Sequence, residues 1–226
     1  MAVIIVGDIQ PSKSLKVLVS DAVSDGCNWM TNRSVQKCVQ LAKQGHKMYL
    51  PAETAMSSDE LIGCHVYFEL ECLPFYSKAK EMIQQGDRPS GVFRYRRKLK
   101  TNGHFESMIS DLYVLSRLFG NPLDTHVKQS KAGVNPAHTI VTLDFGNGRI
   151  AHLEYTESEQ KQIELEWSGI GKIIEFNSEE MVSLSTETNT LTIPIQNIFK
   201  HAQLVNQQLL DQLQGIEHML TGGVQS

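Results

Sequence analysis

The chain has 226 residues, enough for one large domain or two small ones. Its 41% hydrophobic and 20% charged residues are ordinary for a globular protein. A net charge of −4 does not favour nucleic acid, because nucleic-acid-binding domains usually carry a basic excess. No apolar run approaches the ~20 residues that span a bilayer. The first eight residues have no basic segment and predict a strand rather than a signal peptide. We therefore expect a cytoplasmic protein that binds neither nucleic acid nor membrane.

The four cysteines predict structural thiols rather than a metal site. Cys27, Cys38, Cys64 and Cys72 form no CxxC pair and have no regular zinc spacing. In a reducing compartment such residues stay as thiols, and unpaired cysteines are commonly buried. We expect no metal ion.

The first part of the chain alternates apolar runs with helical patterns, which predicts a parallel sheet with crossover helices. Apolar residues at positions 35, 38, 39 and 42 form the stripe of an amphipathic helix, and Gly45 is its expected cap. The other expected elements are strands at Met1–Gly7, Leu15–Ser20, Lys47–Leu50 and His65–Leu70, a helix of one or two turns after Ser57, and a helix at Pro74–Gln85 capped by Gly86.

The second part predicts a mainly antiparallel sheet with helices on it. Asn147 lies between two glycines and two alternating apolar runs, which is a strong hairpin signal. In Val92–Leu99 the cations Arg94, Arg96 and Lys98, continued by Lys100, share one face, and Arg97 points to the other. Such a stripe is more typical of a solvated sheet face than of a phosphate site. The expected strands are Val92–Leu99, Thr125–Gln129, Thr139–Phe145, Arg149–Thr156, Gln162–Trp167, Lys172–Phe176 and Thr190–Ile195, with helices at Phe105–Phe119 and Ile195–Leu220.

Five segments, in the same order, resemble the glucose-fructose oxidoreductase / inositol dehydrogenase (Gfo/Idh/MocA) family. They are Leu18–Leu50 with the following Pro51-Ala52-Glu53, Pro74–Arg94, Asp111–Pro122 with its Leu-Phe-Gly, Thr139–Tyr155, and Glu166–Ile173. Members of that family pair a Rossmann NAD(P) domain with a C-terminal domain built on an open antiparallel sheet.

The resemblance implies a fold with three portions. Residues 1–72 would be a truncated, Rossmann-like parallel α/β portion. Residues 73–195 would be an α+β domain with an open antiparallel sheet and helices on one face. Residues 196–226 would be an amphipathic C-terminal helix that packs back on the first portion.

The resemblance also implies a cofactor site, which this sequence lacks. The family holds the pyrophosphate on a glycine-rich turn after the first strand, where backbone N–H groups and a helix N-terminus bind it. No GxGxxG occurs in the chain, and Gly7 is followed by Asp8-Ile9-Gln10-Pro11. About 65 residues before the second domain are too few for a six-stranded fold of two βαβαβ halves. We expect no cofactor.

The family's proton-transfer groups are absent as well. Its catalytic Lys falls on Ala52, beside Glu53, and its catalytic His falls on Ser110. Two flanking acids of the family fall on Glu106 and Tyr113, and Asp111 is one position from the expected site. An alanine cannot change protonation near neutral pH, so acid–base catalysis at this position is lost. Glu53 could still titrate.

Three functions are left open by the sequence. The first is a catalytically degenerate relative that serves binding or assembly, as a homodimer or larger oligomer through the C-terminal sheet. The residues expected on that surface are Val141, Leu143, Phe145, Ile150, His152 and Glu154. The second is an oxidoreductase or a sugar- or polyol-binding protein, with NAD or NADP in a remodelled or partner-supplied site. The third is a regulatory subunit of a full-length dehydrogenase.

Overall fold

The computed structural model describes residues 2–7, 16–17, 26–31, 34–85, 90–99, 104–131, 133–179 and 191–222. Most of the expected strand Leu15–Ser20, the turn at Asp8–Pro11, the cap Gly86 and Lys100 lie outside these residues. Contacts divide the chain into two compact units. The first unit is Met1–Pro74 with Thr192–Leu213, and the second is Phe75–Leu191 with Gln214–Ser226.

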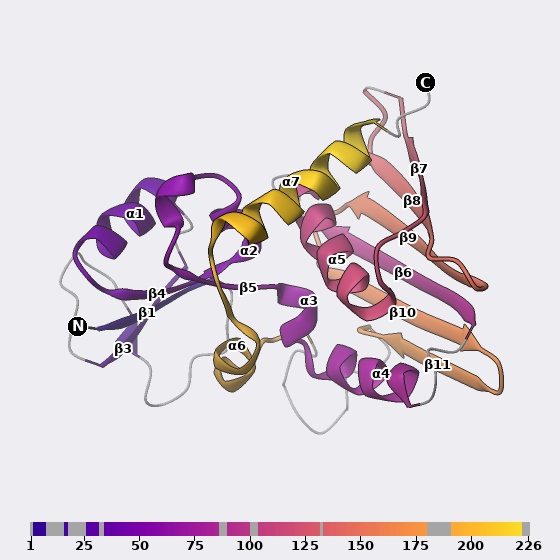
Figure 1. The fold of residues 1–226 in the computed structure, drawn as a ribbon, viewed down its shortest axis with the longest axis horizontal. Helices are drawn as coiled ribbons and strands as arrows, with labels where there is room; N and C mark the ends of the chain where they lie inside the picture. The colour runs from indigo at the N-terminus through magenta and orange to yellow at the C-terminus, as the bar shows by residue number, and fades with distance from the viewer. Residues whose placement is uncertain are drawn as a thin grey trace. The chain divides into compact units, whose positions relative to one another are not determined.

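The first unit is built on a six-stranded sheet in the order β12-β5-β4-β1-β3-β2 (Figure 1). All neighbouring strands are parallel except the pair β12 and β5. The elements are β1 (Val3–Val6), β2 (Lys16–Val17), β3 (Cys27–Met30), α1 (Val35–Lys43), β4 (Lys47–Pro51), α2 (Ala52–Ala55), a 3-10 turn (Asp59–Leu61), β5 (His65–Tyr67), α3 (Glu69–Cys72), α6 (Ile195–His201), β12 (Gln203–Leu204) and the start of α7 (Gln207–Gly222).

The helix α1 forms as its sequence predicts. Its apolar stripe packs on one face of the sheet, where Cys38 and Leu41 join Ile4, Met48 and Leu50 in the core. Gly45 follows with φ of +81°, a conformation that costs glycine little, and its N–H bonds the Ala42 carbonyl.

Two of the strand expectations for the first part of the chain are wrong. Strand β3 is missed, because Cys27–Met30 is short and has only a weak alternation. Strand β5 ends at Tyr67, and the expected strand continues instead as the short helix α3. The sheet has six strands within this short unit, because β2 and β12 have two residues each and β12 comes from the tail.

The expectation for the tail is wrong as well, because the tail is not one helix. Helix α6 starts after Pro194 and ends at His201, and α7 starts at Gln207. Between them β12 pairs with β5, so inter-strand hydrogen bonds replace helical ones although the apolar spacing continues through the break. The strand expected at Thr190–Ile195 is also wrong where the chain is described, because α6 begins at Ile195.

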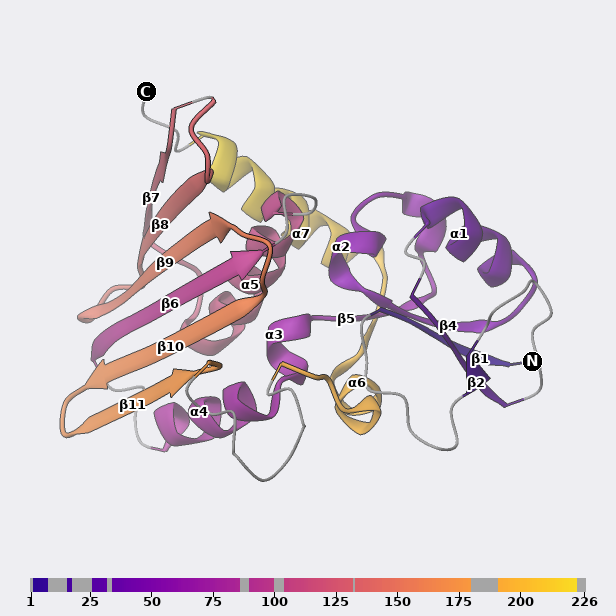
Figure 2. The same cartoon turned by 180° about the vertical axis from the view of Figure 1, so that it is seen from behind.

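The second unit is a six-stranded, mainly antiparallel sheet in the order β11-β10-β6-β9-β8-β7 (Figure 2). Only β6 and β9 pair in parallel. The elements are α4 (Pro74–Gln84), β6 (Gly91–Leu99), α5 (His104–Phe119), β7 (Asp124–Gln129), β8 (His138–Asp144), β9 (Arg149–Glu157), β10 (Gln162–Gly169) and β11 (Lys172–Asn177). The expected fold class, a parallel α/β portion and a mainly antiparallel sheet with helices on one face, is confirmed.

Helix α5 covers one face of the second sheet. Phe119 from α5 lies 5.7 Å from Phe93 and 5.6 Å from Trp167 between ring centroids, and it contacts Phe145 at 5.3 Å. Aromatic pairs at these distances add roughly 0.5–1.5 kcal/mol each beyond their area burial. The predicted hairpin of β8 and β9 is confirmed, and Asn147 at its turn has φ of 55°.

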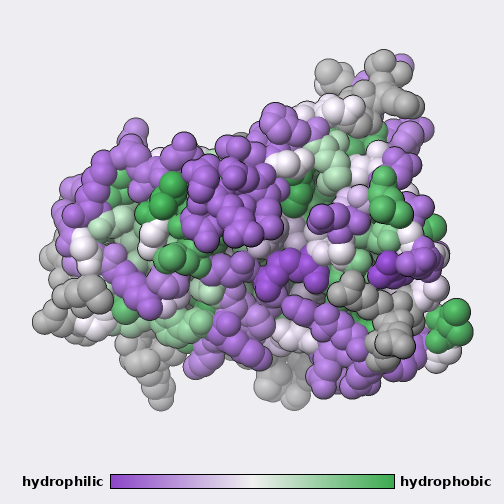
Figure 3. Space-filling view, viewed as in Figure 1, coloured by the Kyte–Doolittle hydropathy of each residue, from purple (hydrophilic) through white to green (hydrophobic). Residues whose placement is uncertain are grey.

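One observation concerns the helices, and another concerns the face of the molecule shown in Figure 3. No helix within the described parts of the chain is long and apolar enough to cross a membrane. The surface seen in Figure 3 is mainly hydrophilic, with apolar residues in small separate groups.

Candidate functional site

The expected lysine position lies at the carboxyl end of β4 in the first unit. Pro51 ends the strand, and Ala52 begins α2 with no exposed surface. The next residue, Glu53, lies half-buried in the first turn of α2. Ligands of open α/β sheets bind outside the carboxyl ends of the strands, so this is the expected place for chemistry. Ala52 presents a buried methyl group there.

Aromatic side chains donate hydrogen bonds to the backbone carbonyls at the end of the neighbouring strand β1. The Tyr67 hydroxyl donates to the Val6 carbonyl at 2.7 Å, and the Trp29 indole N–H donates to the Gly7 carbonyl at 2.7 Å. A dinucleotide needs N–H donors at this place for its phosphates. The described residues offer carbonyls that are already bonded and, at the end of β4, the carboxylate of Glu53. The turn after Gly7, which would carry such donors, lies outside the described residues.

The first unit also holds a group of buried acids that the sequence did not predict. Glu69 and Glu71 on α3 are 9% and 3% exposed, and the His201 ring lies 4.0 Å from the Glu71 carboxylate. The Asn197 amide donates to the Cys72 carbonyl at 2.8 Å. These contacts join α3 to α6. Two acids directly after a buried strand were the available signal.

The cysteines are free thiols whose pKa values are raised by burial. Three of them are buried, Cys27 is half-buried, and all four are free. Burial raises the pKa of Cys38 to about 11 and, together with the nearby carboxylates of Glu71 and Glu69, raises the pKa of Cys72 further. A thiol with a raised pKa is a poor nucleophile and a poor metal ligand at neutral pH. Across the described segments, no group of three His, Cys, Asp or Glu residues could hold a metal ion.

The other expected site residues lie on α5 in the second unit. Ser110 is 1% exposed, Tyr113 is 8% exposed and Glu106 is half-buried. These three positions follow at i, i+4 and i+7 and share one side of the helix. Asp111 points elsewhere and is fully buried.

Asp111 is bound to the sheet rather than open to a ligand. Arg97 of β6 donates from Nη1 to both carboxylate oxygens at 2.9 Å, and the Tyr155 hydroxyl of β9 donates at 3.3 Å. Burial, followed by the nearby Asp111 charge, raises the pKa of Tyr155 well above its usual value, so the phenol stays a donor. Arg97 is itself 4% exposed. The cluster joins α5 to two strands as a structural ion pair.

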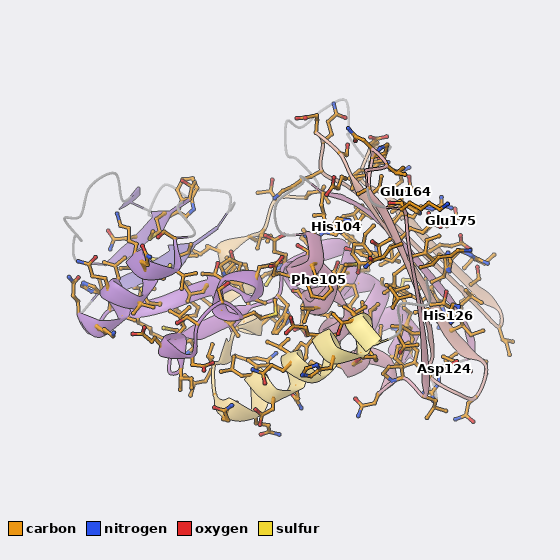
Figure 4. The ribbon with its side chains drawn as sticks, turned by 90° about the horizontal axis from the view of Figure 1, so that it is seen from above. His104, Phe105, Asp124, His126, Glu164 and Glu175 are labelled. Carbon is orange, nitrogen blue, oxygen red and sulfur yellow. The ribbon has the colours of Figure 1, made fainter. Side chains whose placement is uncertain are left out.

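The face of the second sheet away from α5 is open. On β6 the side chains of Phe93, Tyr95 and Arg97 are buried, and those of Arg94, Arg96 and Lys98 are exposed. Figure 4 shows Glu164, Glu175, Asp124 and His126 on this side of the sheet and His104 on the helix side. We call the side of the sheet that carries Arg94 and Arg96 the open face.

Exposed ion pairs run across the open face. Arg94 contacts Glu166 at 2.6 Å, and Arg96 contacts Glu154 at 3.1 Å and Glu164 at 3.3 Å. The two arginine side chains are 46% and 60% exposed. Exposed pairs of this kind contribute ~0–1 kcal/mol each to stability, so the face is not explained by a folding requirement. A groove of about 380 Å³ lies along it beside β10 and β11.

Of the six residues expected on the assembly surface, three lie on the other face of the sheet. Val141, Leu143 and Phe145 lie on the covered face and are at most 4% exposed. Ile150 and His152, with Glu154, lie on the open face. The expected residues of β8 are off by one position, which places them on the wrong face of the sheet. Val141 pairs with the buried Leu153, whereas Thr142 pairs with His152 on the open face.

Comparisons with known proteins show the fold. No protein-family model and no curated protein matches the sequence. Among solved structures, a dehydrogenase from Chromobacterium violaceum is similar at 9% identity and a TM-score of 0.60, over 98% of this chain and 95% of that one. A myo-inositol 2-dehydrogenase from Lactobacillus plantarum is similar at 13% identity and 0.56, over 100% and 90%. A scyllo-inositol dehydrogenase from Lactobacillus casei, with bound NAD(H) and scyllo-inositol, is similar at 12% identity and 0.53, over 98% and 89%. The chain therefore has the fold of these dehydrogenases, as the resemblance of its segments implied.

Proposed function

We propose that the chain is a catalytically degenerate relative of these dehydrogenases, whose fold serves binding and assembly. The observation that carries the proposal is the open face of the second sheet. It presents six strands of side chains to solvent, with ion pairs that contribute little to folding. A second copy of the chain is the proposed occupant of that face.

Three features support the loss of hydride-transfer chemistry. Ala52 has no proton to exchange, Asp111 is held by Arg97, and aromatic side chains bond the last carbonyls of β1. The Ser110 hydroxyl is buried and has no hydrogen-bond partner among the described residues, so nothing there activates it as an acid or base. Each change removes a different part of the same reaction.

The apolar side chains at one end of the open face support assembly. Ile150 is 39% exposed and Ile173 is 70% exposed on that face, and Ile170 in the turn before β11 is 84% exposed. Exposed apolar groups beside polar ones are typical of protein–protein contacts. Burial of Ile150 and Ile173 against a second copy would remove them from water.

Cofactor loss is tested by titrating the full chain with NADH and with NADPH while following nucleotide fluorescence. We expect no saturable binding up to millimolar nucleotide. Micromolar binding of either nucleotide would refute the proposal that the chain is not an oxidoreductase. The scyllo-inositol dehydrogenase from Lactobacillus casei is the positive control.

Assembly is tested by light scattering on Ile173→Asp. We expect a dimer for the unchanged chain and a monomer for the variant, because that end of the open face already carries Asp124 and Asp144, and a further carboxylate buried there would be repelled. The matched control is Ile62→Asp, which changes an isoleucine that is 49% exposed in the first unit. Equal effects of the two changes would argue against the open face.

A polyol-binding function is the second candidate. It is favoured by Glu53, a half-buried carboxylate at the carboxyl edge of the parallel sheet, and by the same fold in a scyllo-inositol-bound dehydrogenase. Saturation-transfer NMR with scyllo-inositol tests it, with Glu53→Gln as the control. A signal that Glu53→Gln abolishes would favour this function over assembly alone. Copurification with a full-length dehydrogenase would favour the role of a regulatory subunit.

A further inference from the structure

The strands of the open face differ in the sign of their charges. On this face the charged side chains of β6 are all cations, Arg94, Arg96 and Lys98, and those of β10 are all anions, Glu164 and Glu166. The edge strands differ too. β7 presents His126 and Lys128, with Asp124 at its start, and β11 presents Glu175 beside Asn177 and Ile173.

The pairing registers place these residues in three rows across the sheet. The first row is His126, Thr142, His152, Arg94, Glu166 and Glu175. The second is Lys128, Ile140, Glu154, Arg96, Glu164 and Asn177. The third is Asp124, Asp144, Ile150, Val92, Ser168 and Ile173.

Two copies that bind open face to open face can be related by a two-fold axis in two ways. Homodimers are usually built on such an axis, so each contact occurs twice. An axis that crosses the strands places every strand over the same strand of the second copy, β6 over β6 and β10 over β10. An axis parallel to the strands exchanges the edges, so β11 lies on β7 of the second copy, β10 on β8, and β6 on β9.

Charge repulsion opposes the axis that crosses the strands. It would place Arg94 and Arg96 against the same two arginines, and Glu164 with Glu166 against the same two glutamates. Like charges that face each other across an interface are unfavourable and suppress the wrong arrangement. Each arginine would then also lose access to a carboxylate of the second copy.

The axis parallel to the strands places opposite charges together. Arg96 then faces Glu154 of the second copy in the second row, and Glu175 faces His126 in the first row, with Lys128 one row away. In the third row Val92 faces Ile150, so an apolar contact forms at the centre of that row. β10 faces Ile140 and Thr142 of β8, which carry no charge. Packed sheets cross at about 30°, so each contact is shared between neighbouring rows.

The charge pattern points to one arrangement. We infer that a second copy of this chain binds the open face about a two-fold axis parallel to β6, with the β11 edge of each copy over the β7 edge of the other. Glu175 and the pair His126 and Lys128 are the residues that select this orientation. Among the described residues neither Glu175 nor Lys128 has an ion-pair partner within one copy. The inference rests on the proposed function, because it names the orientation of the assembly proposed there.

Disulfide trapping distinguishes the two axes. Glu175→Cys alone should not cross-link, because five strand spacings of ~4.8 Å separate the β11 edges of the two copies by roughly 24 Å. A mixture of Glu175→Cys with His126→Cys or Lys128→Cys, oxidised with copper phenanthroline, should give a covalent dimer of the two different chains. The unchanged chain is the control for Cys27, and Ser57→Cys, exposed in the first unit, controls for random collision.

A charge swap provides an independent measurement. Lys128→Glu and Glu175→Lys should each weaken dimerisation about tenfold in sedimentation equilibrium, because each brings like charges together at two symmetric contacts. The double variant Lys128→Glu with Glu175→Lys should restore the dimer, since opposite charges meet again. Circular dichroism checks that each variant is folded.

The outcomes separate this inference from the proposed function. Self-cross-linking of Glu175→Cys, or single charge reversals that leave the dissociation constant unchanged, would overturn the orientation and leave a dimer in place. A double variant no tighter than either single variant would also overturn the orientation. A chain that is a monomer at every concentration would overturn both proposals.

Discussion

Arg96 and Arg97 are neighbours in the chain and lie on opposite faces of the same sheet. Arg96 is 60% exposed and bonds Glu154 and Glu164 on the open face, while Arg97 is 4% exposed and bonds the fully buried Asp111. Both make ion pairs at about the same distance. The two pairs differ in their access to solvent. Water screens the exposed pairs and solvates either charge if the pair breaks, whereas a buried charge that loses its partner is left without water or a counter-charge. Covered-face residues hold the fold, and open-face residues remain available for a partner.

The largest expected effect breaks the covered-face pair. Asp111→Ala should lower the free energy of unfolding by ~3–5 kcal/mol, because it leaves the Arg97 guanidinium buried without its carboxylate. Urea denaturation measures this. The open-face control Glu164→Ala should cost less than ~1 kcal/mol at a concentration where the chain is a monomer.

The double variant Arg97→Met with Asp111→Leu sharpens the interpretation. It should recover most of the stability that Asp111→Ala loses, because an apolar pair of similar volume needs no charge partner. Equal losses for Asp111→Ala and Glu164→Ala would contradict the distinction between the two faces.

A second effect concerns close packing at the end of the covered face. A Cβ on Gly91 would lie 2.6 Å from the Ser168 carbonyl oxygen and 2.8 Å from the Trp167 ring. Gly91→Ala should therefore cost ~1–3 kcal/mol in thermal or urea unfolding. The matched change Gly215→Ala in α7 meets open space and should stabilise by ~0.5–1 kcal/mol. Effects of the same sign at both glycines would count against this packing.

The smallest expected effect is a change in pH dependence. Burial is the first cause that lowers the pKa of His104, whose ring packs 5.8 Å from that of Tyr155. The folded chain thus binds the proton less well than the unfolded chain, so stability is lost as pH falls through the unfolded value of 6.5. Melting temperatures of His104→Phe should fall less between pH 7.5 and pH 5 than those of the unchanged chain.

His65 also contributes to the loss of stability at low pH. Burial, followed by Lys47, lowers its pKa as well. His104→Phe should therefore reduce the loss of stability at low pH without abolishing it. Parallel pH profiles for the variant and the unchanged chain would show that His104 is not a source of the slope.

Local patterns predicted the elements whose signal is local. The turn at Asn147 and the stripe of α1 need only nearby residues, and both were correctly predicted. β12 could not be predicted, because Gln203 and Leu204 become a strand only through pairing with β5, far away in the chain. β3 was missed for a similar reason, since its four residues gain their order from β1.

The role of Asp111 could not be predicted from the sequence. The resemblance placed Asp111 one position from the expected catalytic residue on its helix, but did not pair it with Arg97, which is 14 residues away on a different element. The signal was present: alternation already directed Arg97 away from Arg94 and Arg96, and a cation on a covered face needs a carboxylate. The hydrogen bonds from Tyr67 and Trp29 to the carbonyls at the end of β1 could not be predicted, because they depend on tertiary geometry alone.

The central claim is that the fold serves assembly through the open face. Multi-angle light scattering of the full chain over a hundredfold range of concentration tests it most directly. We expect a species of twice the 25.3 kDa chain mass for the unchanged chain, and a monomer for the Ile173→Asp variant. A mass of 25.3 kDa at every concentration for the unchanged chain would contradict it.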